Sequence, residues 1–457
     1  MKQVASIILA AGKGTRMKSR LPKVLHGICG KPMLSHVISA ASAAGVHRNI
    51  VVIGHGAEMV RQKIGSAVEW VEQVEQLGTG HAVMQAETSL ADFQGNVLIL
   101  CGDTPLITSE TLTQLMQNHE SAGNAATVLT AVMDDPAGYG RIVRDGHGIV
   151  QEIVEHKDAT AEQRQITEIN TGIYCFDAAR LFACLKQISP ANAQGEYYLT
   201  DVLAILKSQG QKIGAAAVRD SLETLGINNR VQLAEAEKIM RLQILYRLMM
   251  DGVTIVDPAN TYIDEGVTIG ADSVVYPGTV IEGKCSIGPE CEIGPYSRLR
   301  DVEVGRRAII QNSIIIESLI GDEVTIGPFA YIRPGTVLED SVKVGDFVEI
   351  KKSVVGKGSK VPHLSYVGDA EIGEKVNIGA GTITCNYDGV KKWKTTIGSN
   401  SFVGSNTNFV APVEVGENAI IGAGSTVTKS VPDGALCVER SKQIIYPEWV
   451  ARKNNKK

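Results

Sequence analysis

The segment LAAGKGTRM, which begins at residue 9, has the residue types needed to hold a phosphate group. Gly12 and Gly14 allow backbone N–H groups to approach phosphate oxygens closely. Arg16 can donate two parallel hydrogen bonds to such oxygens, and Lys23 adds a compact positive charge. The loop follows neither common phosphate pattern, because Met17 replaces the third glycine of the dinucleotide fingerprint and the chain has no Walker A run.

A carboxylate, Asp103, follows the apolar run VLILC. Its oxygens are hard ligands of the kind that Mg²⁺ prefers. Transfer at a phosphorus atom needs positioning and positive charge more than covalent help, and the two segments together offer both. Taken alone, Asp103 would more often cap a helix before Pro105, and a glycine pair would more often form a plain turn.

A second kind of chemistry is possible at His363, in the stretch KVPHLSYVGD. An amine must be unprotonated to act as a nucleophile, and a histidine that titrates near neutral pH can accept its proton. One histidine among nine would usually be a plain surface residue. The role of His363 therefore depends on the elements and motifs around it.

The composition is that of an ordinary soluble protein. A net charge of −5, with 21% charged residues, gives no electrostatic case for nucleic acid. No stretch approaches 18 apolar residues, and the first apolar run lacks the features of a signal peptide, so we expect no stable membrane insertion. The eight cysteines include no Cys-x-x-Cys pair, which argues against a zinc or redox site and favours a cytoplasmic location.

The first half of the chain alternates short apolar runs with amphipathic stretches. We expect strands near residues 4–9, 50–53, 97–101 and 126–132, and helices near 33–44 and 108–119. This alternation predicts an α/β domain with a largely parallel sheet. Ligands bind at the carboxyl ends of the strands in such sheets, which is where LAAGKGTRM and Asp103 would lie.

Residues 229–251 predict one long helix that links two domains. The stretch has helical periodicity and contains neither glycine nor proline, and Gly252 is well placed to end the helix. Asn228, directly before it, could serve as the N-cap. The apolar residues expected to share one face are Val231, Ala234, Met240 or Ile239, Leu242, Leu245 and Met249.

From about residue 263 the apolar residues recur every six positions, a period that predicts a parallel β-helix. The first run is Ile263, Ile269, Val275, Ile281, Ile287, Ile293 and Leu299, and later runs start at Ile320, Val355 and Ile397. A small residue four positions after each aliphatic should also point inward. The residues in that position include Ser273, Thr279, Ser297, Cys285 and Cys291. For the two cysteines we therefore favour thiols packed in the interior over a disulfide bond.

Several polar side chains of the β-helix fall outside the inward positions. Arg333, Lys351, His363 and Tyr366 cannot be explained by burial in the coil. The sequence between Ile378 and Ile397 breaks the period, which indicates a projecting loop with local positive charge. Its lysines are Lys391, Lys392 and Lys394.

The motifs resemble those of a known family when they are taken in order. LAAGKGTRM, LPK, LGTGHA, GDTPL, GYGRI, IVEHKD and INTG resemble the sugar-nucleotide pyrophosphorylases. With GKGSK, HLSYVGD and NIGAGTITCNYDG, the whole chain resembles the bifunctional bacterial N-acetylglucosamine-1-phosphate uridylyltransferases / glucosamine-1-phosphate N-acetyltransferases. The resemblance implies an α/β Rossmann-like nucleotidyltransferase domain (1–228), a linker helix (229–251) and a left-handed parallel β-helix acetyltransferase domain with a C-terminal tail (252–457).

The resemblance implies two reactions that yield UDP-N-acetylglucosamine for peptidoglycan and lipopolysaccharide synthesis. Acetyl-CoA would acetylate glucosamine-1-phosphate, and UTP would then donate a uridylyl group and release pyrophosphate, with Mg²⁺ as cofactor. Arg16 and Lys23 would act on the phosphates, and Asp103 and Asn228 would bind Mg²⁺. Uracil would be recognised by Gln73, Gly78 and Thr79. The sugar would be contacted by Gly140, Glu155 and Asn170. The remaining nucleotide-site residues are Leu9, Ala10, Ala11, Gly12, Cys101 and Gly102.

In the acetyl-transfer site, the resemblance makes His363 the general base. Arg333, Lys351, Tyr366 and Asn377 would hold glucosamine-1-phosphate. Asn386 and Tyr387 lie in the interrupting loop, where they could approach the developing oxyanion. The residues expected to bind acetyl-CoA are Ala380, Asn386, Tyr387, Ser405, Ala423 and Arg440.

Two other functions remain open from the sequence. The chain could be a monofunctional pyrophosphorylase with a structural β-helix, although the long regular coil, His363 and the Asn386–Tyr387 loop argue against this. It could also be a non-catalytic scaffold, which the retained Arg16, Lys23 and Asp103 disfavour. The resemblance further implies a homotrimer that binds small-molecule substrates, with no nucleic-acid partner.

Overall fold

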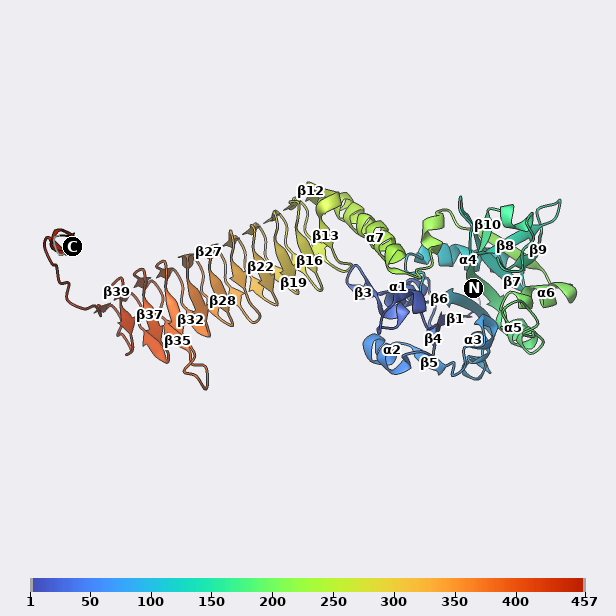
Figure 1. The fold of residues 1–457 in the computed structure, drawn as a ribbon, viewed down its shortest axis with the longest axis horizontal. Coiled ribbons are helices and arrows are strands. Elements are labelled where there is room, and N and C mark those ends of the chain that lie inside the picture. Colours follow the sequence, from blue (N-terminus) through green and yellow to red (C-terminus); the bar gives the residue numbers. More distant parts are fainter. Residues whose placement is uncertain (1–2, 455–457) are drawn as a thin grey trace. The chain divides into compact units, whose positions relative to one another are not determined.

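A computed structural model describes residues 3–454, which form two compact units (Figure 1). The first unit contains residues 1–240 and the second residues 241–457. Within residues 3–454, no helix combines the length and apolar character needed to cross a membrane. We describe each unit separately.

The first unit is built on a nine-stranded mixed sheet. Its strands are β1 (Gln3–Ala10), β4 (Arg48–Ile53), β5 (Glu69–Glu72), β6 (Gly95–Cys101), β7 (Ala126–Val132), β8 (Gly140–Arg144), β9 (Val150–Val154), β10 (Glu168–Asp177) and β11 (Ile213–Ala217). The main order is β11-β7-β10-β6-β1-β4-β5, with β8 and β9 paired beside β10. Strands β1, β4, β5 and β6 run parallel, and every pairing of β8, β9 and β10 is antiparallel. A small hairpin joins β2 (Gly27–Ile28) and β3 (Lys31–Pro32).

Strand β10 departs from the parallel arrangement expected from the sequence. It runs antiparallel to both β6 and β7, with a register shift between Asn170 and Tyr174. The preceding β8–β9 hairpin, rather than a helical crossover, leads the chain into β10. An antiparallel entry needs no crossover helix, so the β-α alternation could not signal it.

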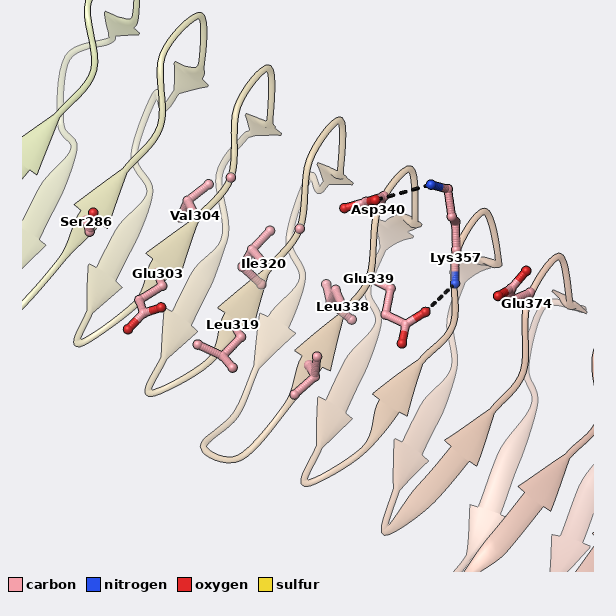
Figure 2. A pocket seen from close by; sticks show the side chains of 13 residues that line it. Ser286, Glu303, Val304, Leu319, Ile320, Leu338, Glu339, Asp340, Lys357 and Glu374 are labelled. Atoms are coloured by element: carbon pink, nitrogen blue, oxygen red, sulfur yellow. Dashed lines mark hydrogen bonds and ion pairs between the residues drawn. The ribbon is translucent and has the colours of Figure 1, made fainter.

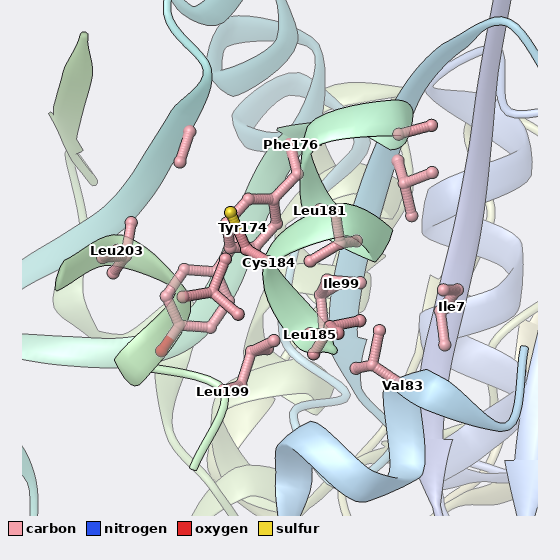
Figure 3. Close-up of a cluster of buried hydrophobic side chains, with 14 of the residues drawn as sticks. Ile7, Val83, Ile99, Tyr174, Phe176, Leu181, Cys184, Leu185, Leu199 and Leu203 are labelled. Carbon is pink, nitrogen blue, oxygen red and sulfur yellow. The ribbon is translucent and has the colours of Figure 1, made fainter. Parts of the chain in front are cut away.

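Helices cover both faces of this sheet and bury two apolar cores. The helices of the unit are α1 (Met33–Ala43), α2 (Ala57–Ile64), α3 (Thr79–Met84), α4 (Ser109–Ala122), α5 (Ala178–Leu185) and α6 (Asp201–Ser208). Leu181 and Leu185 of α5 pack with Ile99 of β6 and Phe176 of β10 (Figure 3). Residues of α1 and α4 pack on the opposite face, and this layering fixes the strand ends that carry the site.

The helix expected over residues 229–251 is α7 (Arg230–Met250), and Gly252 follows it at a φ of 94°. Its buried stripe differs from the expected one. Of the residues expected to share a face, Met240 and Leu245 are buried, but Val231, Leu242 and Met249 are exposed. The other buried residues are Ala236, Ile244 and Leu248, which form a series with Met240 at a spacing of four. Apolar residues occur on several sides of this helix, so periodicity alone does not select the packed stripe.

The second unit is a coil of parallel strands in three stacks, which we call the first, second and third β-helix sheets. The first contains β12 (Thr254–Ile255), β15 (Val274–Val275), β18 (Glu292–Ile293), β21 (Ile309–Ile310), β24 (Thr325–Ile326), β27 (Lys343–Asp346), β30 (Lys360–His363), β33 (Asn377–Ile378), β36 (Phe402–Val403), β39 (Ile420–Ile421) and β41 (Leu436–Cys437). The second contains β13 (Tyr262–Ile263), β16 (Val280–Glu282), β19 (Arg298–Arg300), β22 (Ile314–Ile316), β25 (Tyr331–Ile332), β28 (Glu349–Lys351), β31 (Tyr366–Gly368), β34 (Ile383–Cys385), β37 (Asn408–Val410) and β40 (Thr426–Val427). The third contains β14 (Thr268–Ile269), β17 (Ser286–Ile287), β20 (Glu303–Val304), β23 (Leu319–Ile320), β26 (Val337–Leu338), β29 (Val354–Val355), β32 (Ala370–Ile372), β35 (Thr395–Ile397) and β38 (Val413–Val415).

The interior of the coil is filled as the period of six predicts. The repeated aliphatics are buried, and so are the small residues four positions later, such as Ser273 and Thr279. Cys285 and Cys291 occupy the same inward slot as free thiols, which confirms the packing interpretation. A short C-terminal helix, α8 (Trp449–Asn454), follows the coil and is exposed.

Candidate active sites

A pocket of about 280 Å³ lies at the carboxyl ends of β1 and β6 in the first unit. This is the position expected from the general behaviour of parallel sheets. The sequence-predicted residues that line it are Leu9, Ala10, Ala11, Gly12, Lys23, Gln73, Gly78, Thr79, Cys101 and Asp103. Gly102 is adjacent, with its N–H donating to the Leu9 carbonyl at 2.9 Å. Gln76 and Glu196 also line the pocket and were not predicted.

Lys23 joins the two expected metal ligands. Its ammonium group pairs with the Asp103 carboxylate and donates to the Asn228 amide oxygen at 3.1 Å. Arg16 donates to the same Asn228 oxygen at 2.9 Å. Asn228 lies 212 residues from Arg16 and 205 from Lys23 in the sequence, and Asp103 lies 80 from Lys23, yet the fold brings the four side chains together. Of these, Lys23 and Asp103 line the pocket.

The N-cap of α7 is Asn229, and not Asn228 as the sequence had suggested. The Asn229 side-chain oxygen accepts hydrogen bonds from the backbone N–H groups of Val231 and Gln232, both at 2.9 Å. Gln232 in turn accepts from the Asn228 N–H at 2.8 Å. This reciprocal capping leaves the Asn228 amide oxygen facing Lys23 and Arg16. Asp103 caps no helix either, because α4 is capped by Thr108.

The three residues expected to contact a sugar lie together beside β8 and β10. Gly140 pairs with Asn170 between these strands, and a Cβ added at Gly140 would lie 3.4 Å from Glu155. Burial raises the pKa of the Glu155 carboxyl, and the negative charges of Asp158 and Asp201 raise it further. The glycine thus leaves space beside a carboxylate that can accept hydrogen bonds from hydroxyl groups.

Tyr174 lies close to the residues expected to contact the sugar and to Cys101 at the end of β6. Its buried hydroxyl hydrogen-bonds to Asn170 and lies near Glu155, and burial raises its pKa. Burial likewise raises the pKa of the Cys101 thiol to about 12, so Cys101 is a neutral wall of the pocket. Sequence reasoning missed Tyr174, because an aromatic residue inside a strand carries no signal beyond core packing.

His363 faces outward from the coil, as its position after Val361 predicted, and it pairs with a carboxylate. Its Nδ1 lies 2.5 Å from an oxygen of Asp346, which is its direct neighbour in the strand pair β27–β30. The hydrogen bond from His363 lowers the pKa of the Asp346 carboxyl. Asp346 therefore stays ionised, orients the ring and leaves Nε2 available to accept a proton. The sequence did not reveal this partner, which lies 17 residues earlier.

Arg333 directly follows β25, Lys351 ends the neighbouring strand β28, and Asn386 directly follows β34, with β31 between the last two strands. Arg333 donates to Glu349 at 2.6 Å, and Lys351 lies 3.4 Å from Asp369. The same Asp369 carboxylate accepts from the Asn386 amide at 2.5 Å. The fold thus gathers two cations and an amide donor, and a phosphate group bound here would share them with the Glu349 and Asp369 carboxylates.

Tyr366 and Lys392 complete this group. The Tyr366 hydroxyl reaches over Gly368, where an added Cβ would collide with it. Lys392, from the interrupting loop, lies beside Lys351, and this like charge lowers the pKa of Lys392. The sequence indicated only a positively charged loop, and the structure identifies Lys392 as the lysine that faces Lys351. Tyr387 is exposed in the same loop, and its hydroxyl donates to the Gly389 carbonyl at 2.6 Å.

The residues expected to bind acetyl-CoA form a column along one edge of the coil. Backbone hydrogen bonds connect its levels, from Gly381 to His363 at 3.3 Å, from Asn406 to Ala380 at 2.7 Å and from Gly424 to Ser405 at 2.8 Å. Arg440 lies against Gly424 at the last level. The side chains in this column are small between His363 and Arg440, namely Ala380, Ser405 and Ala423. Asn377 lies in β33, next to β30.

A further hollow of about 520 Å³ lies on the third β-helix sheet, away from all of these residues. Figure 2 shows Glu303, Glu339, Asp340 and Glu374 around it, with Lys357 paired to Asp340 at 3.3 Å. Carboxylates dominate its polar lining, so it would repel the phosphate groups of a nucleotide or of coenzyme A.

Comparison with known proteins finds a family match in each half of the chain. The nucleotidyl transferase family matches residues 5–222, and the bacterial transferase hexapeptide family (six repeats) matches residues 317–352 and 394–429. With the stacked strands, these matches confirm the fold class: a Rossmann-like nucleotidyltransferase domain followed by a left-handed parallel β-helix of hexapeptide repeats.

Curated relatives extend the match to nearly the full length, and each of the following is called a bifunctional protein GlmU. The relative from Heliobacterium modesticaldum is 57% identical over 454 residues, which cover 99% of each chain. That from Pelotomaculum thermopropionicum is 58% identical over 454 residues, again 99% of each chain. That from Geobacillus sp. (strain WCH70) is 54% identical over 452 residues, 99% of this chain and 98% of the relative.

Proposed function

The chain belongs to the family of bifunctional GlmU proteins, and we propose that it makes UDP-N-acetylglucosamine in two consecutive transfers. The first transfers the acetyl group of acetyl-CoA to the amine of glucosamine-1-phosphate. The second transfers the uridylyl group of UTP to N-acetylglucosamine-1-phosphate and releases pyrophosphate. The product feeds peptidoglycan and lipopolysaccharide synthesis. We assign the enzyme to the cytoplasm, where thiols stay reduced, in keeping with its eight free cysteines.

We assign the two reactions to different parts of the chain. Residues 1–228 carry uridylyl transfer, residues 252–457 carry acetyl transfer, and the segment 229–251, which contains α7, links them. The observation that carries this proposal is the presence of two separate clusters with different chemistry. One is the phosphate-type pocket around Lys23 and Asp103, and the other is the His363–Asp346 pair.

In uridylyl transfer, the phosphate of the sugar attacks the α-phosphorus of UTP, and pyrophosphate leaves. Arg16 and Lys23 are the catalytic cations, because they neutralise the charge that spreads over the phosphate oxygens. The glycine loop at Gly12 lets the backbone approach these oxygens. Gln73, Gly78 and Thr79 bind the uracil, while Gly140, Glu155 and Asn170 bind the sugar.

The residues around Lys23 also fit Mg²⁺. The Asp103 carboxylate and the Asn228 amide oxygen already converge on one positive charge, the Lys23 ammonium, and both are hard oxygen donors. We propose that these two oxygens hold the ion together with substrate phosphates. When bound, Mg²⁺ would add positive charge at the reacting phosphates.

In acetyl transfer, the glucosamine amine attacks the thioester carbonyl and coenzyme A leaves as a thiol. His363 Nε2 accepts a proton from the attacking nitrogen, and Asp346 stabilises the imidazolium that forms. Arg333, Lys351, Tyr366 and Asn377 hold the sugar phosphate, and we add Lys392 to them. Asn386 stabilises the oxyanion, and the column from Ala380 to Arg440, with Tyr387, binds acetyl-CoA.

We further propose that the protein is a homotrimer formed through the β-helix. The supporting observation is a row of exposed apolar side chains at the corner that carries His363. Phe329, Phe347 and Leu364 all project there with left-handed backbone, and the two phenylalanine rings stack with centroids 5.4 Å apart. Such a row is unusual on a free surface and suits contact with another chain.

An order-of-addition assay on the purified chain tests the proposed function. Acetyl-CoA and glucosamine-1-phosphate should release a free thiol without UTP. Later addition of UTP and Mg²⁺ should release pyrophosphate and form UDP-N-acetylglucosamine. Pyrophosphate release from ready-made N-acetylglucosamine-1-phosphate, without any thiol release, would instead favour a monofunctional pyrophosphorylase with a structural β-helix.

A further inference from the structure

Gln73 presents only one end of its amide to the nucleotide pocket. The side chain is 3% exposed and lines the pocket. Its Nε2 donates to the Gly78 carbonyl at 3.1 Å and lies 3.0 Å from Nδ1 of His81. A carbonyl oxygen can only accept, so the amide nitrogen must face Gly78. Both hydrogens of this nitrogen are then directed to Gly78 and His81, and Oε1 is the end left for a ligand.

His81 can hold this orientation only in one neutral form. Its Nδ1 must accept from Gln73, so the ring proton belongs on Nε2. Nε2 lies 3.2 Å from the amide nitrogen of Gln85, which also donates to the His81 backbone carbonyl at 3.1 Å. The Gln85 side chain is half-buried, and turning its amide would exchange the bond to this carbonyl for one from the ring N–H to the amide oxygen. His81 lies in the short helix α3 and does not itself line the pocket in the described part of the chain.

The orientation of the Gln73 amide decides which pyrimidine base it can recognise by a hydrogen bond. Uracil carries a hydrogen-bond donor at N3, whereas cytosine carries an acceptor there. An amide oxygen directed at N3 accepts from uracil and opposes the lone pair of cytosine. A turned amide would present N–H and reverse this preference. A site built around such a buried polar group rejects the analogue that leaves the group unpaired.

We propose that His81 determines nucleotide specificity by locking the Gln73 amide with its oxygen toward the base. The inference rests on the proposed uridylyl transfer and on the binding of uracil beside Gln73. His81 is a positioning residue, since it acts through Gln73 and touches neither nucleotide nor sugar. Without it, Gly78 alone orients the amide, and the turned form becomes accessible.

The test compares UTP with CTP in two full-length variants that both carry a side-chain amide at position 81. In His81→Asn, the side-chain oxygen can take the place of Nδ1 and accept from Gln73. In His81→Gln, the longer side chain places its amide nearer the position of Nε2. We expect the ratio of kcat/KM for UTP to that for CTP to fall about fivefold or more in His81→Gln, which corresponds to the loss of about one net hydrogen bond. The ratio should stay near that of the wild type in His81→Asn.

Pyrophosphate release with N-acetylglucosamine-1-phosphate gives both kinetic constants, and thermal unfolding of the same preparations, followed by circular dichroism, checks that the first unit is folded. A purely structural role for His81 would lower activity with both nucleotides equally. An unchanged UTP-to-CTP ratio in His81→Gln would therefore overturn the inference while leaving the proposed function intact. A wild-type chain that transfers nothing from UTP would overturn both.

Discussion

At the residue scale, the first unit places one carboxylate and one amide oxygen around the ammonium group of Lys23. Lys23 contacts Asp103 and Asn228, and Arg16 contacts the same amide oxygen. Each of these side chains is held by another one, so that the geometry is set before a nucleotide binds. Loss of Asp103 would remove a proposed metal ligand and also release Lys23.

We therefore expect Asp103→Ala to lower uridylyl transfer by about 10²–10³-fold, the range typical for loss of one electrostatic catalytic contact. Pyrophosphate release across a Mg²⁺ titration measures the effect. Thiol release in acetyl transfer should stay at the wild-type level. Glu58→Ala is the control, because Glu58 is an exposed carboxylate in the same unit. Normal pyrophosphate release by Asp103→Ala would exclude Asp103 from the metal site.

The environment of Glu155 predicts how the stability of the folded chain depends on pH. Its pKa is raised in the folded chain by burial, then by Asp158 and Asp201. Between the ordinary pKa of a glutamate and the raised pKa of the folded chain, the folded state keeps a proton that the unfolded chain has lost. The stability of the folded state therefore falls as the pH rises through this interval. Glu155→Gln should unfold at a higher temperature than the wild type near pH 8, and the difference should close near pH 4.

The same substitution should weaken the use of N-acetylglucosamine-1-phosphate, because Glu155 is proposed to bind the sugar. Thermal unfolding of the full chain at the two pH values measures the first effect, and KM for the sugar phosphate measures the second. Glu152→Gln serves as the control, since Glu152 is exposed. A Glu155→Gln chain that is less stable at both pH values would contradict the role of burial.

Motifs and resemblance identified most of the residues that line the nucleotide pocket, but not their partners. Asp103 and Asn228 were predicted to bind Mg²⁺, and that role stays a prediction, whereas the capping role expected of Asn228 belongs to Asn229. Asp346 was missed because its contact with His363 is made between coils. His81 stands within the quoted LGTGHA motif, yet only the folded chain brings its Nδ1 to Gln73.

At the element scale, each coil of the β-helix must lie directly on the one before it. Gly345 shows how little space this leaves, because a Cβ added there would collide with the Pro362 carbonyl oxygen of the next coil. Gly345 lies in β27 directly before Asp346, and Pro362 lies in β30 directly before His363. The glycine therefore controls the spacing of the strands that carry the proposed catalytic pair.

Gly345→Ala should separate β27 from β30 and cost about 1–3 kcal/mol of stability, as overpacking typically does. Acetyl transfer should fall sharply, while uridylyl transfer stays near the wild-type level. Thermal unfolding and the two activity assays measure these effects. Gly146→Ala is the control, because a Cβ added at Gly146 meets nothing within 4 Å. Wild-type acetyl transfer in Gly345→Ala would show that this spacing is not critical.

The period of six predicted the coil well, because every turn repeats the same inward positions. The sequence was less informative where several packings satisfy the same pattern. In α7 the expected residues Met240 and Leu245 are buried, but Val231 and Leu242 are exposed, and Ala236 and Ile244 are buried in their place. In the first unit, β10 joins the sheet antiparallel through a hairpin, which β-α alternation does not reveal.

At the scale of the whole molecule, the proposed trimer depends on the exposed row at the corner of the β-helix. Phe347→Asp would place a charge in this row and should shift the protein from trimer to smaller species. Sedimentation equilibrium of the full chain measures the mass. Ile149→Asp, at an exposed apolar residue of the first unit, is the matched control. A Phe347→Asp protein that remains trimeric would remove this corner from the interface.

The central claim is that one chain carries two independent active sites joined by a diffusible intermediate. His363→Ala should lose acetyl transfer by about 10²–10⁴-fold, as expected for loss of a general base, and keep uridylyl transfer. Asp103→Ala should show the reverse.

The most direct test mixes these two variants with glucosamine-1-phosphate, acetyl-CoA, UTP and Mg²⁺. Neither variant alone should form UDP-N-acetylglucosamine, and the mixture should form it, because one variant supplies the N-acetylglucosamine-1-phosphate that the other consumes. Equal loss of both half-reactions in either variant, with no product from the mixture, would contradict the account.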